Sequence, residues 1–308
     1  MDNPPRFLVM TSWARVSRCL PVIAFLAGAT GPARAAQARP SEPPAIAVMT
    51  FNIRYGTADD GENSWPYRRE LVFDVIREQA PDILGVQEAL RSQLDELRAA
   101  FPEYEKIGVG RDDGLEIGEF SAVLYRAERF EVADYGTFWF SDTPDVPSIA
   151  VNWGARLPRV CSWARLVEKE SGRAFYVYNV HFSSRSREAR ERSAEVLVDR
   201  IADRSHSDPV IVTGDFNAGE DNPAMLYLKG EAELLPPLSF RDSFRVLYPS
   251  ATDVGTFNGF KGRSTGEKID AILVSPGWKI ESAAIISTSR SGRYPSDHFP
   301  VVAGLRMP

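Results

Sequence analysis

Apolar residues gather in short runs along the chain, and turn-forming residues separate the runs. Each run is rich in Val, Ile, Phe and Tyr and is bounded by Gly, Pro, Asn or Asp, the pattern of buried β-strands. Eight strands are predicted, at 46–52, 83–88, 122–126, 162–167, 174–181, 210–215, 269–274 and 301–305.

Helical spacing of apolar residues alternates with these strands. It predicts helices at 66–79, 90–100 and 186–203. The charges at 185–192 fit a solvated helix face better than a nucleic-acid patch. From residue 46 onward the chain shows no boundary or repeat, so we expect one α/β domain over 46–308.

Several predicted strands end in a polar residue that is useful for chemistry. Asn52, Glu88 and His181 each end a strand, and Asp215 and Asn217 close another. Open α/β sheets tend to place ligands at such strand ends. Taken alone, each residue has a structural alternative: a turn, a lone buried histidine, or, for Glu88, an acid that favours the start of the next helix.

The N-terminus has a different pattern. Arg6, Arg15 and Arg18 precede an apolar stretch at 19–29, and Ala33-Arg34-Ala35 follows. This predicts a signal peptide at 1–35, a linker at 36–45 and export to the periplasm or the medium. A membrane anchor or a disordered tail is the alternative. No apolar run reaches the roughly 18 residues that span a bilayer, so stable membrane insertion is not expected.

The net charge of the chain becomes more negative when the predicted signal peptide is removed. The chain has 36 basic and 42 acidic residues; without the four Arg and one Asp of residues 1–35, 32 and 41 remain, a net charge of −9. Such a protein lacks the bulk attraction that binds long nucleic acids. One cysteine remains, Cys161, so no intrachain disulfide is possible, and its apolar setting predicts an inert thiol.

Two local motifs carry most of the candidate chemistry. In Val-Thr-Gly-Asp-Phe-Asn (212–217), Asp215 and Asn217 lie on the same side of an extended segment, which suits a water and a phosphate; an Asx turn is the alternative. In Ser-Asp-His (296–298), Asp297 adjoins His298. Asp270 lies in an apolar strand, where a carboxylate is costly unless paired, and His298 is its predicted partner.

The residue inventory also limits the metal. Three histidines, with Cys161, do not fit zinc spacings. There is no Gly-x-Ser-x-Gly elbow and no phosphate loop. Carboxylate, Asn and His side chains favour Mg²⁺ or Mn²⁺.

The order Asn, Gln-Glu, Asn-x-His, Gly-Asp-Phe-Asn, Ile-Asp, Ser-Asp-His resembles the exonuclease–endonuclease–phosphatase superfamily, over about residues 46–308. This superfamily includes deoxyribonuclease I, neutral sphingomyelinases and inositol polyphosphate 5-phosphatases. The resemblance implies a four-layer α/β sandwich, in which helices flank two facing mixed sheets. It also implies that Glu88 is the main Mg²⁺ ligand, with Asn52 and Asp297 beside it.

The same resemblance assigns the catalytic roles. Asp215 would orient or deprotonate the attacking water, and Asn217 and His181 would hold phosphate oxygens. His298, paired with Asp270, would stabilise the charge that develops on phosphate. These roles agree with phosphoryl transfer, which depends on positioning and charge stabilisation.

Further segments, at 52–55, 60–65, 138–144, 157–159 with Trp163, and 255–260, resemble an exported bacterial branch, and we interpret them as specificity loops. Among them, Arg159, Asn258 and Trp139 are the candidate substrate-binding residues. The alternatives are a surface ion pair for Arg159 and a core position for Trp139.

These features predict an exported, Mg²⁺-dependent hydrolase of phosphate esters, either diesters or monoesters. The expected substrate is a small molecule or a lipid head group, and no obligate protein partner is evident. Two alternatives stay open: a secreted nuclease, and a binding protein that has kept the fold and lost turnover.

Overall fold

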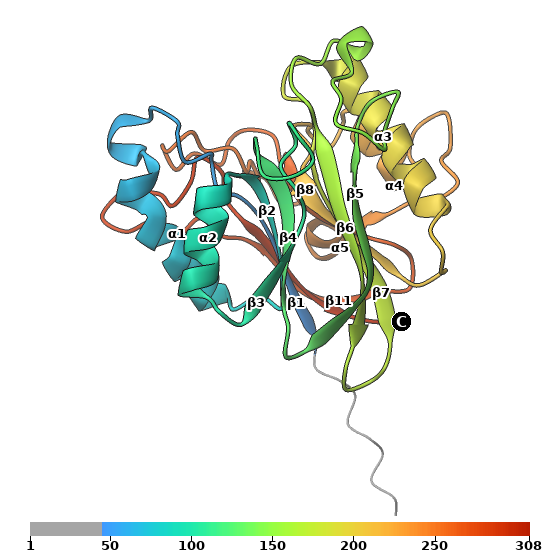
Figure 1. Cartoon of the computed structure of the whole chain (residues 1–308), viewed down its shortest axis with the longest axis horizontal. Helices are drawn as coiled ribbons and strands as arrows, with labels where there is room; N and C mark the ends of the chain where they lie inside the picture. Colours follow the sequence, from blue (N-terminus) through green and yellow to red (C-terminus); the bar gives the residue numbers. More distant parts are fainter. Residues whose placement is uncertain (1–44) are drawn as a thin grey trace, which may run out of the picture. The chain divides into compact units, whose positions relative to one another are not determined.

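The computed structural model describes residues 45–308. The predicted signal peptide lies outside the described residues, as does the linker apart from Ala45. The described part is built around two six-stranded β-sheets with helices on their outer faces (Figure 1). None of its helices is long and apolar enough to cross a membrane.

The first sheet has the strand order β11-β12-β1-β2-β4-β3. Its strands are β1 (Ile46–Asn52), β2 (Ile83–Ala89), β3 (Tyr104–Ile107), β4 (Phe120–Arg126), β11 (Lys279–Ile285) and β12 (Val301–Arg306). β1 and β2 run parallel, and every other neighbouring pair in this sheet is antiparallel. Asn52 and Glu88 therefore reach the same edge of the sheet.

The second sheet has the strand order β5-β6-β7-β8-β10-β9. Its strands are β5 (Phe130–Trp139), β6 (Val160–Glu168), β7 (Ala174–His181), β8 (Val210–Asp215), β9 (Arg241–Asp242) and β10 (Asp270–Val274). β8 is parallel to β7 and antiparallel to β10. In this register, Asp215 lies opposite His181 on one side and Asp270 on the other.

Helices complete four layers. α1 (Trp65–Gln79) and α2 (Arg91–Ala100) bury apolar side chains against the first sheet, and α3 (Arg187–Ala202) and α4 (Pro223–Lys229) do so against the second. A third apolar core fills the space between the sheets. Shorter helices are α5 (Ser243–Leu247), η1 (Gly61–Asn63) and η2 (Val151–Trp153). The predicted four-layer α/β sandwich is confirmed.

Every predicted strand and helix is present, with ends within two residues of the prediction. The four strands that were not predicted, β3, β5, β9 and β11, are the four edge strands of the two sheets. An edge strand is partly exposed and polar, so it lacks an apolar run. Phe138 and Trp139, expected in a loop, end β5, whose middle is largely exposed.

A polar seam joins the two sheets near the ends of β2 and β7. Gln87 Nε2 donates hydrogen bonds to Thr50 Oγ1 (3.0 Å) and, across the sheets, to Asn179 Oδ1 (2.6 Å). Thr213 Oγ1 donates to the same Asn179 oxygen (3.1 Å). All four side chains are fully buried. Because Gln87 adjoins Glu88 and Asn179 lies two residues before His181, the seam fixes the spacing between the two halves of the site.

Substitution of Gly85 tests this seam. A Cβ at position 85 would overlap Thr213 Oγ1 and lie 2.7 Å from Asn179 Oδ1. We expect Gly85→Ala to lower the free energy of unfolding by about 1–3 kcal/mol, measured by urea denaturation. The control is Gly266→Ala, where the nearest atom to the new Cβ is 3.9 Å away. Equal stability of the two variants would contradict the tight seam.

Candidate active site

The predicted catalytic residues converge on one cavity of about 530 Å³. Its lining is Arg54, Glu88, Arg159, His181, Ser184, Asp215, Asn217, Phe257, Gly266, Glu267, Ile269, Asp297 and His298. Asn52 and Asp270 do not line it but hydrogen-bond to residues that do. Residues from both sheets and from the connecting loops thus form a single site.

Asp215 is the centre of the site and is buried at the end of β8. Its Oδ2 accepts hydrogen bonds from Asn52 Nδ2 (3.0 Å) and Asn217 Nδ2 (3.4 Å), and its Oδ1 accepts from the Asn217 main chain (2.8 Å). His181 Nε2 and His298 Nε2 lie 3.5 and 3.8 Å from Oδ2. One carboxylate therefore faces two imidazoles.

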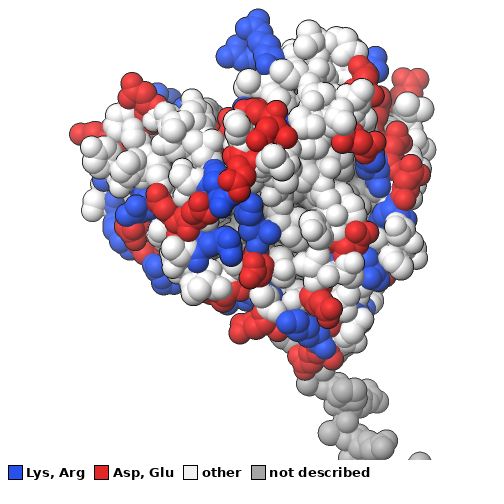
Figure 2. Space-filling view, in the orientation of Figure 1, with Lys and Arg blue, Asp and Glu red and all other residues white. Residues whose placement is uncertain are grey.

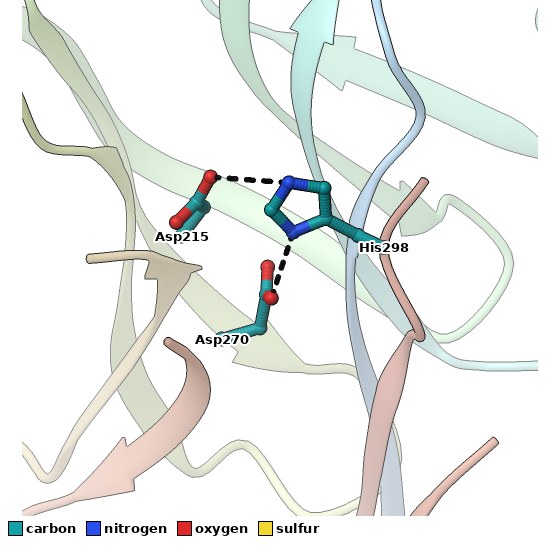
Figure 3. A group of neighbouring side chains, drawn as sticks. All are labelled: Asp215, Asp270 and His298. Carbon is teal, nitrogen blue, oxygen red and sulfur yellow. Dashed lines mark hydrogen bonds and ion pairs between the residues drawn. The ribbon is translucent and has the colours of Figure 1, made fainter. Parts of the chain in front are cut away.

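Asp270 and Asp215 lie on either side of the His298 ring (Figure 3). His298 Nδ1 is 2.9 Å from Asp270 Oδ2, within hydrogen-bonding distance, and both residues are buried. Burial alone would lower the pKa of His298, but the charges of Asp270 and Asp215 raise it well above its usual value. Burial, and then repulsion by Asp270, raises the pKa of Asp215 to about 7. The trio is suited to holding and moving a proton.

The same trio has the spacing of a possible metal site. One ligand atom from each of Asp215, Asp270 and His298 lies within 4.8 Å of the other two. A histidine must be in its neutral form to bind a metal ion. Since the raised pKa of His298 favours the imidazolium and Nδ1 is engaged by Asp270, we interpret the trio as a proton-holding unit.

His181 has a carboxylate neighbour of its own that the sequence analysis did not identify. His181 Nδ1 lies 4.0 Å from Glu119 Oε2, and Glu119 accepts two hydrogen bonds from Arg111, at 2.5 and 2.9 Å. Burial, followed by the charges of Arg159 and Arg111, lowers the pKa of His181 well below its usual value. His181 is therefore neutral near pH 7, whereas His298 favours its charged form.

Glu88 and Asp297 form the other side of the site. Glu88 has a left-handed backbone (φ 60°) beside a β-bulge, and its carboxylate accepts from Asn52 Nδ2 (3.1 Å) and from the main chain of Tyr55 (3.2 Å). Asp297 Oδ1 accepts from Ser296 Oγ (3.2 Å). Burial, and among other charges that of nearby Glu88, raises the pKa of Asp297. Two carboxylates that line the same cavity are an oxygen donor set that fits a hard divalent cation.

Asn52 bridges the two sides. Its amide group donates to both Glu88 and Asp215, and its Oδ1 accepts from the main-chain N–H of Arg54 (3.0 Å). The Arg54 side chain, which the sequence analysis did not assign to the site, pairs with Asp60 through two 3.0 Å hydrogen bonds. Asn52 therefore acts mainly as a hydrogen-bond donor that aligns two carboxylates.

Buried Arg68 holds the loops on this side. Its guanidinium donates to the carbonyls of Asn63 (2.8 Å), Ile53 (2.7 Å), Arg54 (2.9 Å) and Pro295 (3.0 Å). Burial lowers the pKa of Arg68 to about 10. The clamp joins the residues that follow Asn52 to the residue that precedes the Ser-Asp-His motif.

The three candidate substrate-binding residues have different positions. Arg159 lines the cavity. Asn258 does not: it donates to the main chain of Asp297 (2.7 Å) and of Ser296 (3.2 Å), so it supports the metal side from behind. Trp139 is also outside the cavity. Its buried indole N–H donates a hydrogen bond to the Arg111 carbonyl (2.7 Å) and so holds the main chain at Arg111. The structure therefore does not bring Asn258 or Trp139 to a substrate position.

The fold and this site define a phosphoric ester hydrolase of the deoxyribonuclease I-like class. A model of the endonuclease/exonuclease/phosphatase family matches residues 49–298, and the chain belongs to this family. Its members are phosphoric ester hydrolases that typically depend on a divalent metal.

Solved structures and curated proteins agree with this assignment. A family member from Bacteroides vulgatus is 34% identical, with a TM-score of 0.78 and coverage of 86% of this chain and 100% of that one. A mannosyl-6-phosphatase of Bacteroides thetaiotaomicron is 32% identical, with a TM-score of 0.74 and coverage of 85% and 99%. Nocturnin of Drosophila melanogaster is 23% identical over 282 residues, which cover 79% of this chain but only 42% of Nocturnin.

Asp270→Asn tests the His298 pair. Removal of the charge that raises the pKa of His298 should lower that pKa, so the imidazolium should lose its proton at a lower pH. We expect kcat to fall by about 10²–10⁴-fold. Nitrogen-15 NMR of the three histidines measures the pKa. An unchanged His298 titration would contradict the pairing.

Proposed function

We propose that this protein is a Mg²⁺-dependent phosphomonoesterase that acts outside the cytoplasm on a small phosphorylated molecule. The observation that carries the proposal is Arg159. Its side chain lines the cavity, and its buried Nη1 has no hydrogen-bond partner. No carboxylate within the described residues lies within 4 Å of it in an ion pair. A buried, unpaired guanidinium nitrogen is costly unless an anion completes it.

The other cationic groups also support a doubly charged phosphate. Arg54 lines the cavity, 3.9 Å from Glu88 and 3.8 Å from Asp297, and the raised pKa of His298 favours its imidazolium form. Arg159, Arg54 and His298 thus offer three positive groups to one small cavity. A phosphate monoester has three free oxygens that can accept hydrogen bonds from such groups, whereas a diester has only two.

Mg²⁺ is the cation that we propose, with Mn²⁺ as a substitute. Glu88 and Asp297 would hold it, because Mg²⁺ takes one or two protein carboxylates and completes its shell with water and phosphate. When bound, the ion polarises the phosphoryl group and orients the substrate.

The remaining residues carry the reaction by position and charge. Asp215 orients the attacking water and accepts its proton, for which a pKa near 7 is well suited. Asn217 and neutral His181 hold phosphate oxygens. His298, supported by Asp270, stabilises the charge that develops as the new bond from water oxygen to phosphorus forms and the ester bond breaks.

Two lines of evidence favour a small monoester over a long nucleic acid. The similar mannosyl-6-phosphatase is named for a phosphomonoester substrate. On the face drawn in Figure 2, basic side chains gather in small groups that acidic ones border. On that face, such a surface gives weak electrostatic attraction for a polynucleotide.

Export is part of the proposal and rests on the signal pattern at 1–35. Mass spectrometry of the secreted protein should find a mature chain that begins at Ala36. An uncleaved N-terminus would overturn this part alone.

Removal of the metal or of its main ligand tests the cation. We expect EDTA to abolish phosphate release and Mg²⁺ or Mn²⁺ to restore it. Glu88→Gln should weaken Mn²⁺ binding, followed by electron paramagnetic resonance, and lower kcat/KM by about 10³-fold or more. Glu131→Gln, at an exposed position on β5, is the control. Full activity in EDTA would rule out the proposed metal chemistry.

Arg159→Met tests whether Arg159 serves phosphate binding or the stability of the fold. If Arg159 completes its hydrogen bonds only with phosphate, the variant should lose about 10²-fold in kcat/KM for a monoester, with KM raised. Its melting temperature should be equal or higher, because the variant removes an unpaired buried charge. A lower melting temperature with unchanged KM would show that Arg159 serves the fold and not the phosphate.

A further inference from the structure

One wall of the cavity is not used by the proposed chemistry. Phe257, Gly266 and Glu267 line it, and all three belong to the segment between residues 255 and 267. Main-chain hydrogen bonds close this segment on itself, from Gly255 to the Ser264 carbonyl (2.8 Å) and from Thr256 to the Glu267 carbonyl (3.2 Å). Phe257 and Glu267 are therefore held on one wall.

Phe257 is an exposed aromatic ring beside the reacting groups. Its side chain is 52% exposed, and its ring centroid lies 5.2 Å from that of His298, with the planes 70° apart. Its neighbour Thr256 accepts hydrogen bonds from the main chains of Ile269 and Asp270, each 3.0 Å long. The ring therefore lines the cavity directly beside His298. An exposed and rigid ring costs little entropy to use as a binding surface.

Glu267 presents a free carboxylate to the same wall. Within residues 45–308 no Lys or Arg lies within 4 Å of it in an ion pair, and its side chain is exposed. Its carboxyl carbon would lie 2.5 Å from a Cβ at position 219, so Gly219 gives it room. This carboxylate accepts hydrogen bonds from hydroxyl groups and repels a second phosphate.

We propose that Phe257 and Glu267 form a subsite for the leaving group and that they select a cyclic polyol, a sugar whose phosphate is a terminal monoester. The C–H face of the sugar packs on the Phe257 ring, and the sugar hydroxyl groups donate hydrogen bonds to the Glu267 carboxylate. Because Glu267 opposes further phosphates, the subsite disfavours a polynucleotide. The inference rests on the proposed phosphomonoesterase function and adds the class of alcohol that is released.

The test compares two monoesters, a hexose 6-phosphate and methyl phosphate. Both present the same phosphate, but only the hexose has a ring and hydroxyls for the subsite. The quantity measured is the ratio of the two kcat/KM values. We expect Glu267→Gln and Phe257→Ala each to lower this ratio by about 10–100-fold, the range for loss of a charge-assisted hydrogen bond or of a packed face.

Controls separate this effect from general damage. Glu131→Gln and Tyr135→Ala, both at exposed positions on β5 outside the cavity, should leave the ratio unchanged. Circular dichroism melting of each variant confirms folding, which is expected because Phe257 and Glu267 are exposed.

The outcomes distinguish the inference from the function on which it rests. Equal losses on both substrates, or a higher kcat/KM for a nucleoside 5′-monophosphate than for the hexose phosphate, would overturn the sugar subsite alone. If the wild type releases phosphate from none of these monoesters, the proposed function is wrong and the subsite falls with it.

Discussion

The buried carboxylate of Asp215 is the constraint on which the rest of the site depends. An ionised carboxylate without solvent is unstable unless hydrogen bonds and positive charge surround it. Asn217 supplies two of those hydrogen bonds from the next turn, and Asn52 supplies one from the opposite sheet. Strand register places His181 and Asp270 on either side. The charge of Asp215 therefore requires that both sheets end at one place.

The seam between the sheets makes that convergence rigid. Asn179 and Gln87 join the sheets one or two residues before His181 and Glu88. Glu88 on β2 and His181 on β7 thus keep a fixed separation. Arg68 adds a second constraint from the helix side, because it binds carbonyls of loops that precede or follow site residues. Preorganised charge of this kind is what phosphoryl transfer requires.

Much of this was predictable from sequence, for physical reasons. Central strands are buried on both faces, so their apolar runs predicted their positions. The polar residues at the ends of these strands predicted where the site lies. Edge strands such as β5 lack that pattern, which is why Trp139 was placed in a loop. Glu119 and Arg54 were missed because the site residues that they approach, His181 and Glu88, lie far away in sequence. Arg68 was missed because its partners are main-chain carbonyls, which no local motif encodes. Likewise, no local pattern distinguishes Arg159, which faces the cavity, from Asn258, which faces a turn.

In the proposed mechanism, Asp215 accepts the proton of the attacking water while Glu88 and Asp297 hold the cation. Asp215→Asn separates these roles, because it keeps an oxygen acceptor but removes the base. The measurement is kcat together with the Mn²⁺ dissociation constant of the same variant. We expect a fall in kcat of at least about 10³-fold and a change in Mn²⁺ affinity of less than about tenfold. A variant that keeps kcat within tenfold, or that no longer binds Mn²⁺, would contradict it.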